Sequence, residues 1–472
     1  MTARWLRTAV ASVALALVTT APSSAAPPPG SPSASPTASA VESSWPQFGR
    51  VATHLHTAPD ETAFTPETID GLSVEWKGQL NDFTTNTGGA AVEGGFAYVG
   101  GTDGVLSVFA AGGCGAAVCQ PLWRGSTDNG IFSTPAVIDD IVLVGSADHF
   151  LYAFPAAGCG ASECEPSWRG QLEDAALASS PAVADGTAYL GDFSGRLYAF
   201  PVAGCGEPIC EPAWVGRGHA AEQITSAPAV ANGHVYVGTF ANTFDRVSGR
   251  LLVFDAAGCG EAVCRATWRA NIHGPVGGNG APVVAGDVVY IGSGTEFSER
   301  PDSKRHLFAF PADGCGADRC DPLWSYRTDD LGVVAGPAVS GDVLYASVQA
   351  TPDPNTVGVV AAYPAEGCGS EVCDALWTGV NFASGFESPP VVTGGLVLVA
   401  KGPASGFPVD AAVLSYPADG CGSDVCEALS FTQVGLEQNY SGAPLAVAAG
   451  TIFMASQESS GPSFLYALTT PG

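Results

Sequence analysis

Residues 151–168 read LYAFPAAGCGASECEPSW, and variations of this stretch occur seven times along the chain. In each copy an aromatic residue stands five positions before a Cys-Gly-x-x-x-Cys sequence. In six copies a tryptophan stands four positions after the second cysteine. Equivalent cysteines recur every 45 to 56 residues, a period that is typical of repeat architectures. The pattern predicts a strand, a short loop that contains both cysteines, and a second strand in every copy.

The 14 cysteines of the chain all lie in these loops. Metal binding would require two loops to converge on one ion, but loops on separate repeats are expected to point away from one another. The even number, the strict spacing and an export signal at the N-terminus favour a disulfide within each loop. The predicted disulfides are Cys114–Cys119, Cys159–Cys164, Cys205–Cys210, Cys259–Cys264, Cys315–Cys320, Cys368–Cys373 and Cys421–Cys426.

Each full repeat contains four predicted strands, named A to D in chain order. In the third repeat, strand A begins at Pro181, a hairpin turn follows at Asp185-Gly186, and Thr187–Gly191 forms strand B. The aromatic strand before the cysteine loop is C, and the tryptophan strand after it is D. Residues 436–472 supply only A, B and C, and residues 71–80 supply an unpaired D strand that contains Trp76.

Joining these two ends predicts an all-β, eight-bladed β-propeller of four-stranded blades. The N-terminal outer strand would close the ring beside the three C-terminal strands, which removes the open sheet edges. The alternative is seven blades followed by a C-terminal hairpin.

The N-terminus predicts export. Arg4 and Arg7 precede an apolar run that ends at Val18 and is followed by small residues, the pattern of a signal peptide cut near Ala25 or Ala26. The run is too short for a membrane span. The expected organisation is a signal peptide at residues 1–26, a disordered Pro/Ser/Ala-rich leader at 27–41 and the propeller at 42–472, secreted to the extracellular space.

The chain is acidic, with 46 Asp and Glu against 18 Lys and Arg and a formal net charge of −28. Such a surface is soluble and repels nucleic acid and anionic membrane. We therefore expect a monomer without nucleic-acid partners.

The repeat resembles that of the quinoprotein (PQQ-like) β-propellers. PAVADGTAYLGDFSGRLYAFPVAG at residues 181–204 matches the family's A-B-C pattern, and AFPAAGCG followed by tryptophan resembles its tryptophan-docking motif. The cysteine loop replaces the motif's Thr-Gly turn, and proline usually replaces its aspartate. The resemblance covers residues 45–472 and implies tryptophans that pack between blades. It does not decide function, because enzymes and non-enzymatic propellers share the repeat.

Alternating strand directions place the A–B and C–D loops, with the disulfides, on one face, and the B–C and D–A loops on the other. The B–C loops are short in the first three repeats and longer afterwards, which suggests a binding surface. The alternative is harmless drift of exposed loops. The longer loops are Thr239–Gly249, Ser293–Arg305, Gln349–Gly358, Lys401–Asp410 and Gln457–Pro462.

Candidate ligand-binding residues lie near the mouth of the central funnel. The residue three positions before each strand A proline is small or apolar in most repeats, but it is Asn279 in one and Glu387 in another. An amide and a carboxylate there predict a ligand or Ca²⁺ site, which Glu222, His273 and Asn439 in neighbouring D–A loops could join. The alternative is polar loop residues that bind backbone or water. His54-x-His56 is a weak metal pair.

Two functions compete. The first is a secreted, non-catalytic binding module that presents the long B–C loop face to a protein, glycan or small molecule. The second, implied by the resemblance, is a PQQ-dependent oxidoreductase that requires PQQ and calcium. Enzymes of that kind carry adjacent cysteines under the cofactor and an aspartate base, and neither can be assigned here. We therefore predict no catalytic residues and favour binding.

Overall fold

The computed structural model of the chain describes most of residues 43–471, within a unit that spans residues 39–472. The described ranges are 43–82, 88–218, 222–243, 246–272, 276, 280–293, 306–327, 332–333, 335–349, 357–370, 374–382, 388–401, 411–434, 439–440, 443–458 and 462–471. The expected signal peptide and leader, which end at residue 41, lie outside these ranges.

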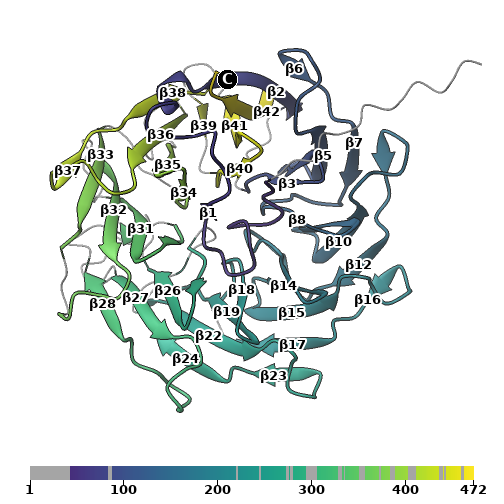
Figure 1. Ribbon diagram of the computed structural model, residues 1–472. Helices are drawn as coiled ribbons and strands as arrows, with labels where there is room; N and C mark the ends of the chain where they lie inside the picture. Colours follow the sequence, from purple (N-terminus) through teal and green to yellow (C-terminus); the bar gives the residue numbers. More distant parts are fainter. Residues whose placement is uncertain are drawn as a thin grey trace, which may run out of the picture. The chain divides into compact units, whose positions relative to one another are not determined.

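Eight antiparallel sheets surround a central axis (Figure 1). Each sheet contains strands A to D in order from the axis outward, as the sequence predicts. Blade 1 comprises β3 (Ala91–Glu93), β4 (Phe96–Gly100), β5 (Val105–Ala110) and β7 (Trp123–Ser126). Blade 2 comprises β8 (Ala136–Ile138), β9 (Ile141–Gly145), β10 (Phe150–Pro155) and β12 (Trp168–Gln171). Blade 3 comprises β13 (Ala182–Ala184), β14 (Thr187–Gly191), β15 (Arg196–Pro201) and β17 (Trp214–Arg217). Blade 4 comprises β18 (Ala229–Ala231), β19 (His234–Gly238), β22 (Arg250–Asp255) and β24 (Trp268–Asn271).

The second half of the ring repeats this order. Blade 5 comprises β25 (Val283–Ala285), β26 (Val288–Gly292), β27 (His306–Pro311) and β28 (Trp324–Arg327). Blade 6 comprises β30 (Ala338–Ser340), β31 (Val343–Gln349), β32 (Val357–Pro364) and β33 (Trp377–Phe382), with the two-residue β29 (Gly332–Val333) paired to β31. Blade 7 comprises β34 (Val391–Thr393), β35 (Leu396–Lys401), β36 (Ala412–Pro417) and β38 (Ser430–Gln433).

Blade 8 joins the two ends of the chain. Its first three strands are β40 (Ala446–Ala448), β41 (Thr451–Glu458) and β42 (Pro462–Thr469), with β39 (Asn439–Tyr440) paired to β41. Its outer strand is β2 (Ser73–Asp82), which pairs antiparallel with β42 and places Trp76 opposite Ala467. The predicted closure of an eight-bladed ring is confirmed, and the seven-blade alternative is wrong.

The cysteine loops also pair with the preceding blades, which the sequence did not predict. Each described loop places a short stretch around its second cysteine parallel to the outer strand of the preceding blade, which thereby gains a neighbour on its open edge. These two- or three-residue strands are β6 (Val118–Cys119) on β2, β11 (Glu163–Cys164) on β7, β16 (Ile209–Cys210) on β12, β23 (Val263–Arg265) on β17 and β37 (Val425–Cys426) on β33. A single parallel bridge from Arg319 to Arg269 plays this part on β24.

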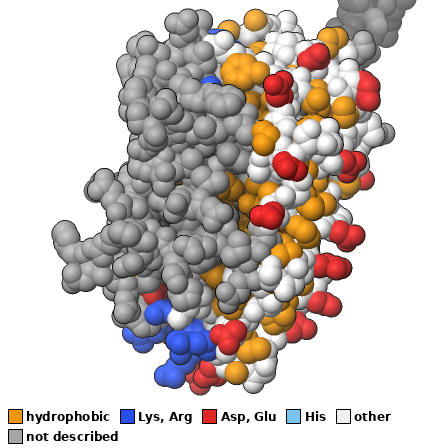
Figure 2. All heavy atoms as spheres, turned by 90° about the vertical axis from the view of Figure 1, so that its left-hand side faces the viewer, with side chains coloured by type: hydrophobic (Ala, Val, Ile, Leu, Met, Phe, Trp, Pro, Cys, Tyr) orange, Lys and Arg blue, Asp and Glu red, His pale blue; other side chains and the backbone are white. Residues whose placement is uncertain are grey.

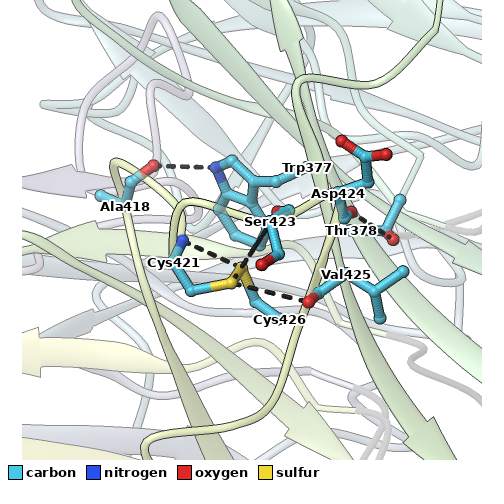
Figure 3. Close-up of a disulfide and its surroundings, with 8 residues drawn as sticks. All are labelled: Trp377, Thr378, Ala418, Cys421, Ser423, Asp424, Val425 and Cys426. Atoms are coloured by element: carbon cyan, nitrogen blue, oxygen red, sulfur yellow. Dashed lines mark hydrogen bonds between the residues drawn. A yellow bond between two sulfur atoms is a disulfide. The ribbon is translucent and has the colours of Figure 1, made fainter.

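Six of the seven predicted disulfides are present in the described residues. Cys368 is also disulfide-bonded, whereas Cys373 lies outside the described ranges. Figure 3 shows the loop that closes on Cys421–Cys426. There the hydroxyl of Thr378, in the preceding blade, donates to the carbonyl of Asp424 at 3.1 Å, and the N–H of Thr378 donates to the same carbonyl at 2.8 Å. The disulfide therefore holds a loop that ties two blades together.

Blade 7 is covered differently at the rim, because none of the described cysteine loops pairs with its outer strand. Its outer strand β38 contacts the short 3-10 helix η1 (Ile69–Gly71) instead. The Thr432 hydroxyl donates to the carbonyl of Leu72 at 3.4 Å. The N-terminal segment thus covers the edge that a disulfide loop covers elsewhere.

Tryptophans dock between blades, as the resemblance implied. Trp377 packs against Gly420 of the next blade, where an added Cβ would lie 2.7 Å from the indole ring. Gly420 also has a φ of +77°, so glycine satisfies both the backbone and the contact. The indole N–H of Trp377 donates to the carbonyl of Ala418 at 3.1 Å (Figure 3).

The rim is acidic with scattered apolar residues. Figure 2 shows Asp and Glu side chains interspersed with hydrophobic ones over the described part of the rim that lies on the left in Figure 1. Several exposed apolar residues directly precede a second cysteine, namely Val118, Ile209, Val263 and Val425. They lie in separate loops and are held apart by the blade spacing.

Candidate functional site

Three of the five predicted ligand residues lie outside the described ranges: Asn279, Glu387 and His273. Asn439 begins β39 and faces Glu458 across the β39–β41 pair. Glu222 is described, and it is 4% exposed. Of the five residues, only Glu222 has a side chain that the structure describes.

Glu222 is engaged by its own blade. Its carboxylate forms an ion pair with Arg250 and accepts a hydrogen bond from the Thr239 hydroxyl at 2.8 Å. The Thr239 hydroxyl oxygen in turn accepts the backbone N–H of Arg250 at 2.9 Å. These contacts span the two ends of a long B–C loop, so Glu222 positions that loop.

The B–C loop of blade 4 is itself structured. β20 (Ala241–Thr243) and β21 (Arg246–Ser248) pair as a small antiparallel sheet. Phe240, just before β20, exchanges two backbone hydrogen bonds with Gln223 of the D–A loop, at 2.8 and 2.9 Å. The β20–β21 hairpin is thus fastened to the neighbouring loop on the predicted binding face.

The central axis holds a feature that the sequence did not predict. Residues 43–61 follow the inner edge of the ring, where Figure 1 shows the purple N-terminal trace among the inner strands. The middle residue of strand A in seven blades donates its N–H to this segment. The donors are Val92 to Trp45 O, Val137 to Pro46 O, Val183 to Gln47 Oε1, Val230 to Ala52 O, Val284 to Thr53 O, Val339 to Leu55 O and Val392 to His56 O.

The segment reaches blade 8 through side chains. Ser43 Oγ accepts the N–H of Ala449 at 2.6 Å, and Glu61 Oε2 accepts that of Gly450 at 2.6 Å. Both donors lie in the A–B turn between β40 and β41. In blade 7, β1 (Thr57–Ala58) pairs parallel with strand A. The axial segment therefore lies toward the face that carries the A–B turns.

Phe48, His54 and His56 form the centre of this axial segment. Each histidine ring lies 5.0 Å from the Phe48 ring in an edge-to-face arrangement, and the two histidine rings are 6.5 Å apart between centroids. Both histidines are 1% exposed. Burial lowers the pKa of His54 to about 4 and that of His56 well below its usual value.

The sequence offered only a weak signal for this arrangement. Residues 43–70 lack the repeat yet contain the buried aromatics Trp45, Phe48 and Phe64. A non-repeating stretch that is rich in aromatics needs a surface to bury it, and the inner strands supply that surface. The His54-x-His56 pair is the part that residue spacing alone could have identified.

A family model described as outer membrane protein assembly factor BamB, a PQQ-like repeat model, matches residues 68–313. The chain belongs to this PQQ-like propeller family. No curated protein matches the sequence.

Solved structures share the propeller fold at low sequence identity. A europium-containing methanol dehydrogenase is 10% identical with a TM-score of 0.63, and the match covers 90% of this chain and 98% of that one. Quinohemoprotein alcohol dehydrogenase from Comamonas testosteroni is 11% identical with a TM-score of 0.62, over 90% and 80% of the two chains. BamB from Moraxella catarrhalis is 14% identical with a TM-score of 0.53, over 83% and 99%.

Asn279 and Glu387, the pair that could hold the calcium implied by the resemblance, lie outside the residues that the structure of this PQQ-like propeller describes. Among the described residues, no three His, Cys, Asp or Glu side chains gather as a metal site. Glu222, the one predicted ligand whose carboxylate is described, is neutralised by Arg250.

Proposed function

We propose that the protein is an exported, non-catalytic propeller that binds a protein, glycan or small molecule on the face of its B–C and D–A loops. The β20–β21 hairpin is the observation that carries this proposal. Blade 3 also has an ion pair between its D–A loop and the first residue of strand C, formed by Glu173 and Arg196, but its short B–C loop contains no such hairpin. Glu222 and Arg250 hold the hairpin, and the exchange between Gln223 and Phe240 holds its first strand.

The position of the axial segment also favours a binding site on the face of the B–C and D–A loops. Residues 43–61 line the inner strands toward the A–B turns, so a ligand on the axis would approach from the B–C and D–A side. Propellers and other repeat folds commonly bind through loops gathered on one face.

The disulfides support export. The six described disulfides are typical of proteins in oxidising compartments. In the part of the chain that the structure describes, no helix is long and apolar enough to cross a membrane. The description of the matching family model is that of an assembly factor, which agrees with a binding role.

A loop exchange tests the proposed binding face. Residues 239–249 would be replaced by Asp192–Gly195, the short B–C loop of blade 3. The two loops close in an equivalent way. Asp192 Oδ1 accepts the N–H of Arg196 in blade 3, and the Thr239 hydroxyl accepts the N–H of Arg250 in blade 4. The control is Val263→Ser, an exposed change on the disulfide loops.

Both variants and the wild type would be screened on a glycan array and against proteins of the culture medium. We expect ligands whose binding is lost on the exchange and kept in the control. Ligands that bind all three proteins equally would overturn the proposed face.

The competing function is a PQQ-dependent oxidoreductase, and its basis is the similarity of the fold to the two dehydrogenases. Thermal melts with PQQ, with Ca²⁺ and with both would separate the functions, because a ligand of the native state raises the Tm by mass action. A binding module should melt unchanged. An increase that requires both PQQ and Ca²⁺ would replace our proposal with the oxidoreductase.

A further inference from the structure

Three ring nitrogens on the propeller axis lack hydrogen-bond partners among the described residues. They are Nε2 of His54 and both Nδ1 and Nε2 of His56. Buried polar atoms normally find a partner, and an orphaned one calls for an explanation such as an ion or a water. One ion could bind Nε2 of His54 and one nitrogen of His56, and the other nitrogen of His56 would then carry the proton.

The hydrogen bond of His54 fixes which of its nitrogens is available. Nδ1 lies 3.1 Å from the carbonyl oxygen of Pro282. A carbonyl only accepts, so Nδ1 carries the proton and Nε2 presents a bare lone pair. Imidazoles that bind metals are commonly oriented in this way, by donating their other N–H to a backbone carbonyl.

The backbone around the pair is held in an unusual conformation. His54 has a φ of +58° and His56 a φ of +54°, in the left-handed region that few residues other than glycine adopt and in which asparagine, aspartate and histidine are enriched. Residues other than glycine in this region cluster at active sites and ligand-binding sites. The alternate spacing of the two histidines brings both rings against Phe48.

The donor set selects the kind of ion. Two neutral imidazoles would hold it, and the described residues around them include no third His, Cys, Asp or Glu that could complete a metal site. Burying a divalent ion without a carboxylate is costly, because the Born energy rises with the square of the charge. A monovalent ion with an affinity for imidazole carries the smallest such cost.

The spacing of the rings agrees with two-coordinate geometry. With metal–nitrogen bonds of about 2.0 Å, a linear bridge separates the ring centres by about 6.4 Å, and a tetrahedral one by about 5.2 Å. The observed separation is 6.5 Å. Monovalent d¹⁰ ions favour linear coordination, whereas Zn²⁺ is tetrahedral.

We propose that His54 and His56 form an axial binding site for a soft monovalent metal ion of the copper(I) class. The proposal does not depend on the function proposed above.

Silver(I), which is redox-silent and linear, is the probe. The exported protein would be unfolded in guanidinium with its disulfides intact and refolded with one equivalent of Ag⁺, so that slow entry cannot hide binding. Native mass spectrometry would count the ions. In ¹⁵N-histidine-labelled protein, we expect two of the seven imidazoles to shift until one equivalent is bound.

Substitutions assign the site. His54→Asn and His56→Asn should each abolish the one-to-one binding. His149→Asn is the matched control, because His149 is exposed and has a similar φ of +73°. If a variant fails to fold, the wild-type spectrum decides. The absence of a bound ion at one equivalent, a shift of other histidines, or unchanged binding in the axial variants would overturn the proposal.

Discussion

Contacts between blades depend on a few residues whose side chains could not be larger without a clash. Gly125 on strand D faces Phe154 of the next blade, and an added Cβ would lie 2.7 Å from that ring. Five tyrosines on strand B reach in the same direction, each donating its hydroxyl hydrogen to a backbone carbonyl of the next blade. These are Tyr98 to Ala156, Tyr189 to Ala256, Tyr236 to Ala312, Tyr290 to Ala365 and Tyr345 to Ala418.

Gly125→Val should therefore destabilise the protein. Phe154 is fully buried and cannot move aside, so we expect a loss of about 1–3 kcal/mol in the free energy of unfolding. Denaturant unfolding would measure it. Gly112→Ala is the control, because nothing lies within 4 Å of an added Cβ there. Equal stability of the two variants would contradict the proposed fit between blades.

The axial histidines predict a pH dependence. The pKa of His54 is lowered to about 4 by burial, so between pH 6.5 and 4 the unfolded chain binds a proton that the folded protein does not. Stability should fall as the pH drops through this window, with about 3 kcal/mol from His54. Unfolding at pH 7 and 4.5 should show a smaller loss for His54→Gln than for the wild type. Parallel losses would count against a buried neutral His54.

At the scale of elements, the cysteine loop is both a cross-link and a strand. In blade 3, Cys205–Cys210 closes a small ring, and the loop offers the carbonyl of Pro208 to the N–H of Arg169 at 2.9 Å. The covalent ring restricts the unfolded chain, and the strand covers an outer edge of the preceding blade. Loss of the disulfide should therefore have both a global and a local effect.

The double variant Cys205→Ser with Cys210→Ser tests both effects. The chain-entropy model predicts a loss of about 2 kcal/mol in the free energy of unfolding. Hydrogen exchange should also accelerate at the Arg169 amide and stay unchanged at the Arg124 amide, which bonds to Ser162 in another loop at 2.8 Å. If both amides exchange as before, the disulfide does not hold the strand in place.

Over the whole molecule, the repeat was predictable and its attachments were not. The period of the cysteines predicted the blades, and Trp76 outside the repeats predicted the closing strand, because both rest on local patterns. The pairing of loops with neighbouring blades depends on where an edge lies unpaired, which no spacing within one repeat records. The position of the axial segment could not be predicted for the same reason, because its seven acceptors bond to residues up to several hundred positions away in the sequence. The predicted ligand cluster relied on loop polarity and stays a prediction, because only Glu222 has a described side chain, and that side chain pairs with Arg250.

The two roles of the N-terminal region can be separated by truncation. Deletion of residues 1–42 removes nothing that the described structure uses. Deletion of 1–61 also removes the acceptors of the inner strands but keeps β2. Each lost hydrogen bond is worth about 1 kcal/mol, so this truncation should melt markedly lower and yet remain a closed ring. Deletion of 1–82 removes β2 as well, exposing β42 and the apolar face beneath Trp76.

The three truncations should therefore melt in this order, with the last lowest and prone to associate through its open edge. Thermal melts and light scattering would measure the two effects. Unchanged melting after deletion of 1–82 would contradict closure through β2. Equal melting after deletion of 1–42 and of 1–61 would show that the axial segment adds no stability, and its conformation would then have to be explained by what the two histidines bind.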